Sequence, residues 1–318
     1  MHEVLVVGDA VVDIIVPFPR LSGEGKRRAE FFQPCIQGGG TAANTAVALS
    51  RLGVPVSFIG SVGDDQYGRY VRKDFEAEGV ATGAMIIEPD LNTVGVFAFV
   101  DESGERYLWG WPRVDQAFKV IDESKVDFGA VREAAWVHSS GMALVHDSSA
   151  RSSIIDIFRE AKEAGVPTSF DLNLRADDGR IDPAFRGAVM EVVEDSSYVL
   201  GSGEEEFAPL GPGNWRENAR ALVREGRTIV VRLGREGAIG MAEGGESEEP
   251  AFPVEVVDTV GAGDVFDAAF IAALLRGAEL RVALREGNAG AGFKVARKGA
   301  RNSPRVPELR AFMEQYEE

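Results

Sequence analysis

The chain has 318 residues, of which 45% are hydrophobic, so it is long and apolar enough to form the core of one large domain. Its formal net charge of −17 argues against a broad basic surface, and therefore against nucleic acid as a partner. Cys35 is the only cysteine, which excludes an internal disulfide. The sequence shows no signal-peptide pattern, and no apolar run approaches the roughly 20 residues of a membrane helix. We therefore expect a cytoplasmic protein without a membrane partner.

Short apolar segments alternate along the chain with longer amphipathic ones. Strands are expected at residues 4–7, 56–59, 136–139, 169–172, 198–200 and 229–233. Helices are expected at residues 41–52, 67–78 and 149–164, each with a glycine shortly after its end. Repeated strand–helix–strand units predict an α/β fold: a doubly wound, mostly parallel sheet between two helical layers, in a single domain over residues 1–318. Ligands of such sheets bind beyond the carboxyl ends of the strands.

Two regions break this alternation, because their strands are not followed by helices. Residues 11–17 form one of them, and residues 93–111 form the other. Within the second region, residues 94–100 and 106–111 flank a short polar turn and predict a hairpin. We therefore expect a small β-sheet inserted beside the main sheet. The polar and acidic residues 243–250 are expected to form a solvated loop.

The most informative segment is Gly261-Ala262-Gly263-Asp264, which precedes an apolar stretch at residues 265–275. This stretch is long enough for a helix and apolar nearly all round, so the helix is expected to be buried. Backbone N–H groups at its start are unpaired and can hold an anion, while Asp264 offers a carboxylate for a proton. Together they meet two needs of phosphoryl transfer. The tetrapeptide alone is also typical of an ordinary glycine-rich turn with an acidic cap.

Residues 257–266, VDTVGAGDVF, resemble the second signature of the ribokinase-like (PfkB) carbohydrate kinases. Residues 38–53, which begin GGGTAANTA, resemble the first signature, and the two occur in the expected order. The resemblance implies a ribokinase-like fold whose small β-sheet is a lid over the sugar and a dimer contact, so a homodimer is expected. It also implies ATP-dependent phosphorylation of a hydroxyl of a sugar or sugar acid, with Asp264 as general base and residues 261–263 as anion hole. At a helix start, Asp264 is expected to be ionised.

The positions that match the family's sugar-binding residues are Asp13, Gly39, Gly40, Asn44 and Arg175. Asp13 could instead be an ordinary acid at a strand end, the glycines a turn capped by Thr41, and Arg175 a member of a surface ion pair. Residues 38–43 also fit a loose G-x-G-x-x-A dinucleotide pattern. No convincing strand precedes them, so NAD binding is not expected.

The positions that match the family's nucleotide side are Arg232, Gly234, Gly237, Asn288 and Glu206. Glu206 belongs to an N-x-x-E element that helps to arrange magnesium and phosphate, and Mg²⁺ is expected to bridge the phosphates of ATP. In this chain Gly203 stands where the asparagine usually does, which puts that arrangement in doubt. Residues 204–206, all glutamates, are also favourable in a solvated first helical turn. No Walker-type loop is present in the sequence.

Many family members also bind a monovalent cation beside the anion hole. The matching positions are Asp258, Val260, Val295, Lys298 and Ser303. The resemblance therefore implies potassium as a further cofactor.

The substrate is left open by the sequence. Residues 140–144 and 171–175 look closest to the 2-keto-3-deoxygluconate kinase and fructokinase branch, and a ribose-type pocket is the next choice. Trp109 and Trp111 alternate on one face of a lid strand, where they could stack on a sugar or on the base of a nucleoside, or pack in a subunit interface. The departure at Gly203 is the only support for another class of function, a non-catalytic sugar-binding regulator on the same fold.

Overall fold

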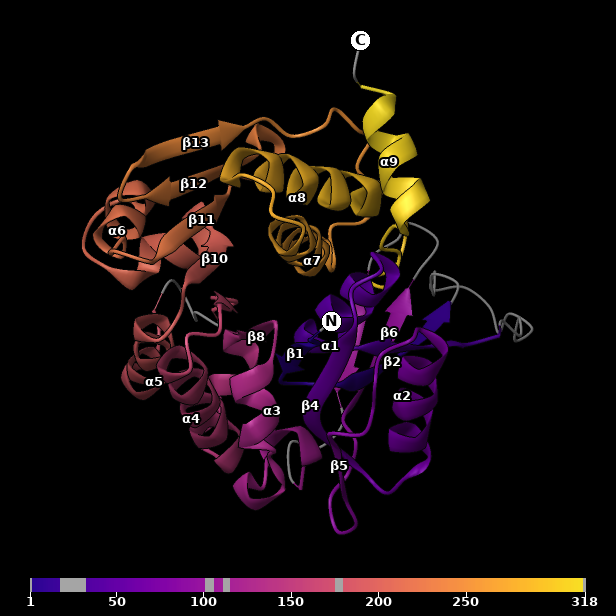
Figure 1. Ribbon diagram of the computed structural model, residues 1–318. Coiled ribbons are helices and arrows are strands. Elements are labelled where there is room, and N and C mark those ends of the chain that lie inside the picture. The colour runs from indigo at the N-terminus through magenta and orange to yellow at the C-terminus, as the bar shows by residue number, and fades with distance from the viewer. Residues whose placement is uncertain (1, 18–32, 101–105, 111–114, 175–179, 317–318) are drawn as a thin grey trace.

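A nine-stranded sheet forms the centre of the computed structural model, which describes residues 2–17, 33–100, 106–110, 115–174 and 180–316 (Figure 1). In spatial order its strands are β13 (Gly245–Glu249), β12 (Ala238–Ala242), β11 (Thr228–Arg232), β10 (Tyr198–Ser202), β9 (Thr168–Asp171), β8 (Trp136–Ser140), β1 (Val4–Val7), β4 (Val56–Gly63) and β5 (Met85–Glu88). All neighbouring pairs are parallel except β11–β12 and β12–β13. The carboxyl ends of the parallel strands therefore meet at one edge, where ligands of such sheets bind.

Helices cover both faces of this sheet (Figure 1). One layer contains α1 (Thr41–Arg51), α2 (Gln66–Ala77), α7 (Ala262–Leu275), α8 (Leu280–Val295) and α9 (Val306–Glu314). The other contains α3 (Phe128–Glu133), α4 (Ser149–Glu163), α5 (Pro183–Glu194) and α6 (Trp215–Ala221). Single turns of helix lie at Ala117–Lys119, Glu123–Lys125, Gly141–Leu144, Gly203–Phe207, Ala208–Leu210 and Gly234–Glu236. Within the described ranges, no helix has the length and apolar character needed to cross a membrane.

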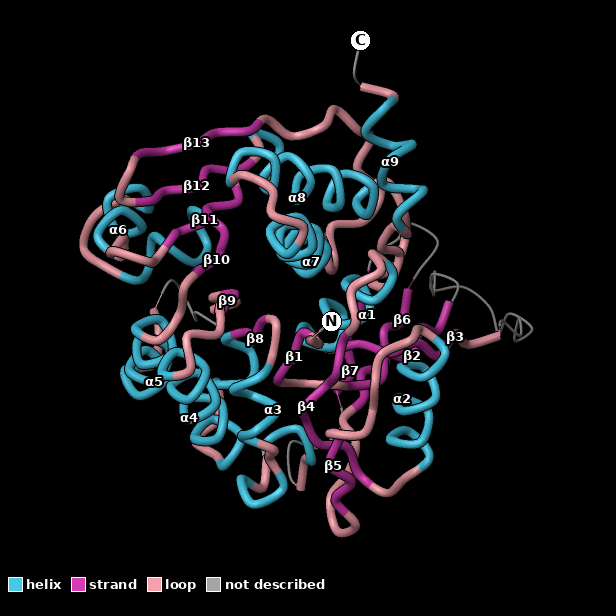
Figure 2. Tube along the Cα trace, in the orientation of Figure 1, coloured by secondary structure: helices cyan, strands magenta, loops and turns pink. Residues whose placement is uncertain are grey.

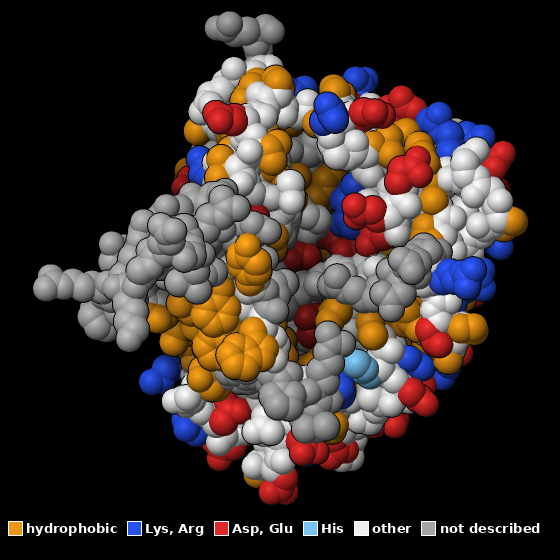
Figure 3. Space-filling model, turned by 180° about the vertical axis from the view of Figure 1, so that it is seen from behind, with side chains coloured by type: hydrophobic (Ala, Val, Ile, Leu, Met, Phe, Trp, Pro, Cys, Tyr) orange, Lys and Arg blue, Asp and Glu red, His pale blue; other side chains and the backbone are white. Residues whose placement is uncertain are grey.

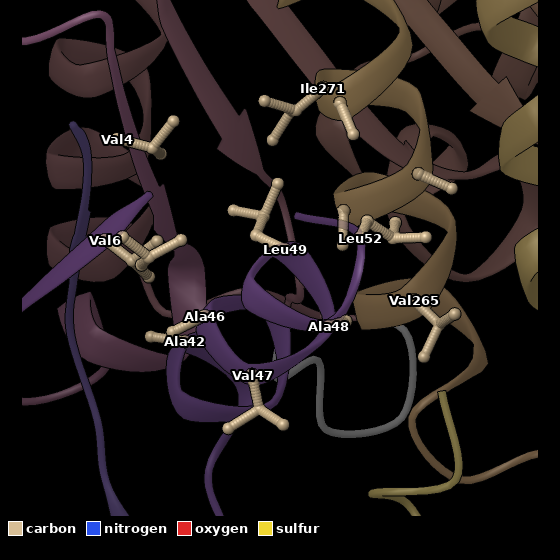
Figure 4. Close-up of a cluster of buried hydrophobic side chains, with 14 of the residues drawn as sticks. Val4, Val6, Ala42, Ala46, Val47, Ala48, Leu49, Leu52, Val265 and Ile271 are labelled. Atoms are coloured by element: carbon tan, nitrogen blue, oxygen red, sulfur yellow. The ribbon is translucent and has the colours of Figure 1, made fainter. Parts of the chain in front are cut away.

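Helix α7 lies at the centre of its layer. Its residues 264–273 are all buried, as expected for a helix that is apolar nearly all round. It packs against α1 and α8, and Val265 and Ile271 belong to one hydrophobic cluster with Val6 of β1 and Leu49 of α1 (Figure 4). This packing fixes the first turn of α7 against the sheet.

The doubly wound sheet between two helical layers confirms the predicted fold class. The predicted strands and helices are present, and their ends differ by a few residues. The largest difference is at β4, which continues to Gly63 because its second half pairs with β5, from Gly60 opposite Met85 onward. Pairing with a later strand is a long-range effect that a local pattern does not contain.

The expectation of a solvated loop at residues 243–250 is wrong in its central part. Strand β13 lies there as the edge strand of the sheet, antiparallel to β12. Its last residue, Glu249, is buried and accepts a hydrogen bond from Arg281 of α8. Backbone hydrogen bonds to β12 order this acidic segment, and charged side chains are common on edge strands.

Four further strands form a second, smaller sheet that confirms the predicted lid (Figure 2). Its order is β3 (Cys35–Gly39), β2 (Val11–Pro17), β6 (Gly95–Val100) and β7 (Arg106–Gly110). Strand β3 corrects the statement that no strand precedes residues 38–43. It pairs with β2 in the lid, so these residues do not follow a strand of the main parallel sheet, as a dinucleotide-binding turn would.

Strand register separates two faces of the lid. Phe97 pairs with Ile14 and with Trp109, so these three side chains share one face. Asp13 neighbours Ile14 in β2 and therefore points to the opposite face. Trp109 is 70% exposed and Tyr107 48% exposed. The aromatic face thus lies on the side of the lid away from Asp13, while Trp111 is outside the described residues.

Candidate active site

The start of α7 is an open helix N-terminus. Gly261 precedes the helix with φ +80°, a left-handed conformation that favours glycine, and a Cβ atom there would lie 2.8 Å from the carbonyl oxygen of Ala300. No side chain caps this helix, so N–H groups of its first turn are available to an anion. The structure therefore places the predicted anion hole, residues 261–263, at a fixed helix start.

Asp264 and Asn44, which come from the two sequence signatures, meet at this point. The Asn44 Nδ2 group donates a hydrogen bond of 2.8 Å to Oδ2 of Asp264. Both residues are buried, at 8% and 7% exposure for Asn44 and Asp264. The Asn44 Oδ1 atom is buried without a hydrogen-bond partner in the described part of the chain. A buried acceptor beside a carboxylate is suited to a hydroxyl of a bound molecule.

Burial raises the pKa of Asp264 from 3.8 to about 7. The hydrogen bond from Asn44 opposes this shift, whereas the nearby carboxylates of Asp171 and Asp9 add to it. The helix N-terminus favours the ionised form of Asp264, but removal of the carboxylate from water has the larger effect on its pKa. A pKa near neutrality suits a general base.

A single buried arginine lies beneath the start of α7. Arg232, at the end of β11, is 2.5 Å from Asp171, 2.7 Å from Asp267 and 3.4 Å from Glu206. A Cβ atom on Gly263 would lie 3.0 Å from its Nη1 atom, so the guanidinium contacts the anion-hole segment directly. The structure thus brings Arg232 and Glu206 together as predicted, but inside a network of ion pairs.

The carboxylates of this network have perturbed pKa values. Burial raises the pKa of Asp171 to about 6, although Arg232 lowers it, and burial raises the pKa of Asp267 well above its ordinary value. Neither residue is among the predicted site residues. The available signals were the position of Asp171 at the end of a strand and of Asp267 one turn after Asp264.

The acceptor side is built around the junction of β1, β3 and α1. Asp9, which sequence reasoning missed as a site residue, accepts hydrogen bonds from the backbone N–H groups of Thr41 and Ala42, at 3.1 and 3.2 Å. It therefore caps α1 from the end of β1. Gly40 has φ +101°, and a Cβ atom there would lie 2.6 Å from the carbonyl oxygen of Asp9, so the glycine permits this close approach.

Asp13 of β2 and Gly39 of β3, two of the predicted sugar-binding residues, lie against each other beside the loop that enters α1. A Cβ atom on Gly39 would be 2.6 Å from Oδ2 of Asp13. Behind this loop, Arg301 donates a 3.0 Å hydrogen bond to the carbonyl of Gly38 and lies 3.2 Å from Asp74. Arg175 falls outside the described residues.

Figure 3 shows a hollow between the lid and the main sheet, with acidic side chains on its floor and hydrophobic side chains gathered on the lid side. Of the described residues, no three His, Cys, Asp or Glu side chains form a cluster that could hold a metal ion.

The predicted nucleotide residues lie along one edge of the site but play structural parts. Gly234 and Gly237 have φ +57° and +106°, and a Cβ atom on Gly237 would lie 2.0 Å from the carbonyl of Glu249. Asn288 donates hydrogen bonds to the carbonyls of Glu249 and Pro250, at 2.9 and 3.2 Å. These contacts position the turn after β11 and the segment after β13.

The departure at Gly203 has a packing explanation. A Cβ atom there would lie 3.0 Å from Leu233 and 3.2 Å from Trp215, so these two side chains occupy the space of a larger residue. Glu206 turns back and accepts a 2.5 Å hydrogen bond from the backbone of Ser202. Glu206 is therefore held in place without help from residue 203, and it is buried rather than solvated.

The predicted cation-binding positions also come together, near the segment that leads into α7. The backbone N–H of Asp258 donates to the carbonyl of Val295, and that of Gly299 donates to the Asp258 carboxylate. Lys298 and Ser303 lie in the turn that follows α8. The buried ammonium group of Lys294 approaches Asp258 as well.

The chain is similar to several known proteins. A family profile described as pfkB family carbohydrate kinase matches residues 1–307. An ATP-dependent ribose-1-phosphate kinase of Halopiger xanaduensis is 33% identical over 98% of both chains. A fructokinase of Vibrio alginolyticus is 31% identical over 99% of this chain and 100% of its own. A crystal structure from E. coli, provisionally named Ribokinase II and solved with ATP and Mg²⁺, is 24% identical and covers 99% of this chain and 100% of its own, with a TM-score of 0.84.

The raised pKa of Asp264 predicts a pH-dependent gain in stability on replacement by asparagine. In the native state Asp264 titrates at about 7, whereas its ordinary value is 3.8. Between these values the native state binds a proton that the unfolded chain has released, so this aspartate lowers the free energy of unfolding as the pH rises. We expect Asp264→Asn to stabilise the protein by about 2 kcal/mol more at about pH 8 than at about pH 5.

Urea denaturation of both proteins at the two pH values measures this difference. Asp147→Asn is the matched control, because the Asp147 side chain is 98% exposed. An equal effect of Asp264→Asn at both pH values would contradict the shift.

Proposed function

Because this chain belongs to the pfkB family of carbohydrate kinases, we propose that it transfers the γ-phosphoryl group of ATP to a hydroxyl of a neutral sugar of the fructose or ribose type. The observation that carries the proposal is the hydrogen bond between Asn44 and Asp264 at the open start of α7. This hydrogen bond joins the amide of Asn44 on α1 to the carboxylate of Asp264 in the first turn of α7, next to the uncapped helix start, which supports the proposal.

In this mechanism Asp264 is the general base that removes the proton of the acceptor hydroxyl as its oxygen attacks the phosphorus atom. Asn44 holds one carboxylate oxygen, which leaves the other to accept the proton. The N–H groups at the start of α7 that have no backbone acceptor within the described residues, those of Gly261 and Gly263, stabilise the charge on the transferring phosphoryl group, whereas the N–H of Ala262 donates to the carbonyl of Thr259. Arg232 positions the start of α7, because its guanidinium donates hydrogen bonds to carboxylates there.

A magnesium ion carried by ATP fits the donor set of this site. Mg²⁺ prefers carboxylate oxygens together with phosphates and water. Glu206 and Asp267 are the carboxylates that would face it, and Asp267 Oδ2 is buried without a partner within the described residues. When bound, the ion neutralises negative charge on the phosphates.

The charges of the acceptor side favour a neutral substrate. Three carboxylates, those of Asp9, Asp13 and Asp264, lie beside the segment that joins β3 to α1. Carboxylates accept hydrogen bonds from sugar hydroxyls but repel anions. Arg301, behind this segment, forms an ion pair with Asp74 and donates from Nε to the carbonyl of Gly38, while its buried Nη1 and Nη2 atoms have no hydrogen-bond partner among the described residues. The named relatives act on a pentose phosphate and, for the fructokinase, on a hexose, so both ring types belong in the test.

Release of ADP from Mg-ATP across a panel of acceptors tests the proposal. The panel contains fructose, ribose, ribose-1-phosphate, 2-keto-3-deoxygluconate and nucleosides. We expect the highest kcat/KM with a neutral ketohexose or pentose, at least about tenfold above its anionic counterparts, because the anions meet the carboxylates. A preference for a phosphorylated sugar or a sugar acid would overturn the neutral-substrate part, and a preference for nucleosides would identify a nucleoside kinase.

Replacement of the proposed base separates chemistry from binding. We expect Asp264→Asn to lower kcat at least about 100-fold, the range for loss of a positioned base, with little change in the Kd for ATP by calorimetry. In the wild type, kcat/KM is expected to fall below about pH 7, since the base must be ionised and its pKa is raised to about 7. Asp147→Asn serves as the exposed control. Turnover of Asp264→Asn within about tenfold of the wild type would remove Asp264 from this role.

We further propose that the aromatic face of the lid forms a homodimer contact. Trp109, Tyr107 and Ile36 are exposed by 70%, 48% and 45%, and this face points away from Asp13. Large exposed apolar patches are uncommon on monomers, and aromatic side chains are enriched at interfaces. A role in stacking on the sugar would require Trp109 on the other face.

Light scattering coupled to gel filtration tests the contact. We expect the wild type to be a dimer and Trp109→Glu to be a monomer, because a buried charge opposes association. Ser152→Glu adds the same charge on α4, in the opposite helical layer, and is expected to remain dimeric. A monomeric wild type would disprove the dimer, and a dimeric Trp109→Glu would disprove the surface.

A further inference from the structure

A completely buried lysine lies behind the loop that leads into α7. Lys294, in the last turn of α8, has 0% exposure. Its Nζ atom donates a 2.6 Å hydrogen bond to the backbone carbonyl of Asp258 and lies 3.9 Å from the Asp258 carboxylate. Burial of an ammonium group is unfavourable unless oxygen atoms surround it, so this lysine brings a compensated positive charge to the loop.

Oxygen atoms at four of the five expected cation-binding positions, those of Asp258, Val295, Lys298 and Ser303, already accept hydrogen bonds. The two carboxylate oxygens of Asp258 accept from the N–H groups of Val260 and Gly299, at 3.1 and 2.8 Å. The carbonyl of Val295 accepts from the N–H groups of Val257 and Asp258, at 2.7 and 3.0 Å. Donors that point at an oxygen occupy the positions from which a metal ion would approach it.

The turn after α8 shows the same pattern. The side chain of Asn302 donates to the carbonyl of Lys298. Arg51 donates to the carbonyl of Ser303, at 3.2 Å, and is itself held by a two-point ion pair with Glu78. Organic cations therefore face the expected ligands from two sides, from Lys294 on α8 and from Arg51 on α1.

We propose that the Lys294 ammonium group takes the place of the monovalent cation beside the anion hole, so that this enzyme works without potassium. The residues at these positions are poorly suited to a potassium ion, because most of their oxygens already accept hydrogen bonds and the lysine would repel a second cation. The proposal rests on the proposed function for its kinetic consequence, but the contacts of Lys294 can be tested in the protein without ligands.

The contact reaches the chemistry through a short stretch of backbone. Three residues separate Asp258 from Ala262, and the N–H of Ala262 donates to the carbonyl of Thr259 in this stretch, at 3.1 Å. Lys294 thus fixes the carbonyl of Asp258, where this loop begins, and the loop ends at Gly261. Lys294 is a positioning residue for the anion hole, and its loss is expected to affect phosphoryl transfer more than sugar affinity.

The first test uses the wild type in chlorides of potassium, sodium and tetramethylammonium at equal ionic strength. We expect kcat, the Kd for ATP and the melting temperature of the ligand-free protein to be the same in the three salts, with kcat within about twofold. Saturable activation by potassium of more than about fivefold, or a specific rise in melting temperature, would overturn the proposal.

The second test removes the ammonium group. Lys294→Ala leaves space at the site, and we expect its kcat to fall at least about tenfold with a smaller change in the KM for the sugar. Potassium or ammonium ions, but not tetramethylammonium, are expected to restore several-fold of this loss and to raise the melting temperature of the variant. Lys294→Met keeps the apolar stem and fills the space, so it is expected to lose activity without rescue.

Lys73→Met, which removes an exposed lysine from α2, is the matched control and is expected to behave as the wild type in every salt. Wild-type kcat in Lys294→Ala would overturn the proposal. If either variant does not fold, the other variant and the wild-type salt series decide the outcome. If no sugar is phosphorylated by the wild type, the proposed function fails, while the melting temperatures still report whether Lys294 replaces a cation.

Discussion

The burial of one guanidinium among three carboxylates governs the position of the central helix. Arg232 connects the ends of three neighbouring strands to α7: it belongs to β11, Asp171 ends β9, Glu206 follows β10, and Asp267 lies in the helix. None of these charges could stay buried if its partners were removed, since an unpaired charge in the interior is strongly unfavourable. The network therefore makes the sheet edge and the helix start one rigid unit, and the anion hole depends on it.

Burial, with the nearby carboxylates of Asp171 and Asp9, explains the raised pKa of Asp264. Negative charges exceed positive ones around α7, so Asp264 is buried near groups of its own sign and its pKa lies far above that of an exposed aspartate. A fold selected for stability alone would not place a carboxylate there. The burial that makes the ionised form of Asp264 unfavourable also gives a base that titrates near neutral pH. Active sites commonly show this opposition between stability and activity.

Local patterns were sufficient for much of the fold and for the centre of the site. The run at residues 261–275 predicted a buried helix with an open start, and the alternation of strands and helices predicted the layers. Strand β13 escaped prediction because its order comes from pairing with β12 rather than from its acidic side chains. Asp9 and Lys294 escaped because their importance lies in contacts with distant residues: one caps α1, and the other holds the carbonyl of Asp258.

The lid is built from two excursions of the chain, one directly after β1 and the other after β5, whereas α7 and its supporting strands come from the C-terminal half. The lid strands and the start of α7 therefore belong to separate stretches of sequence, and the hydrogen bond between Asn44 of α1 and Asp264 of α7 joins the two sequence signatures. Such a division allows the sequence of the lid to change during evolution, and with it the acceptor, while the phosphate chemistry is inherited unchanged.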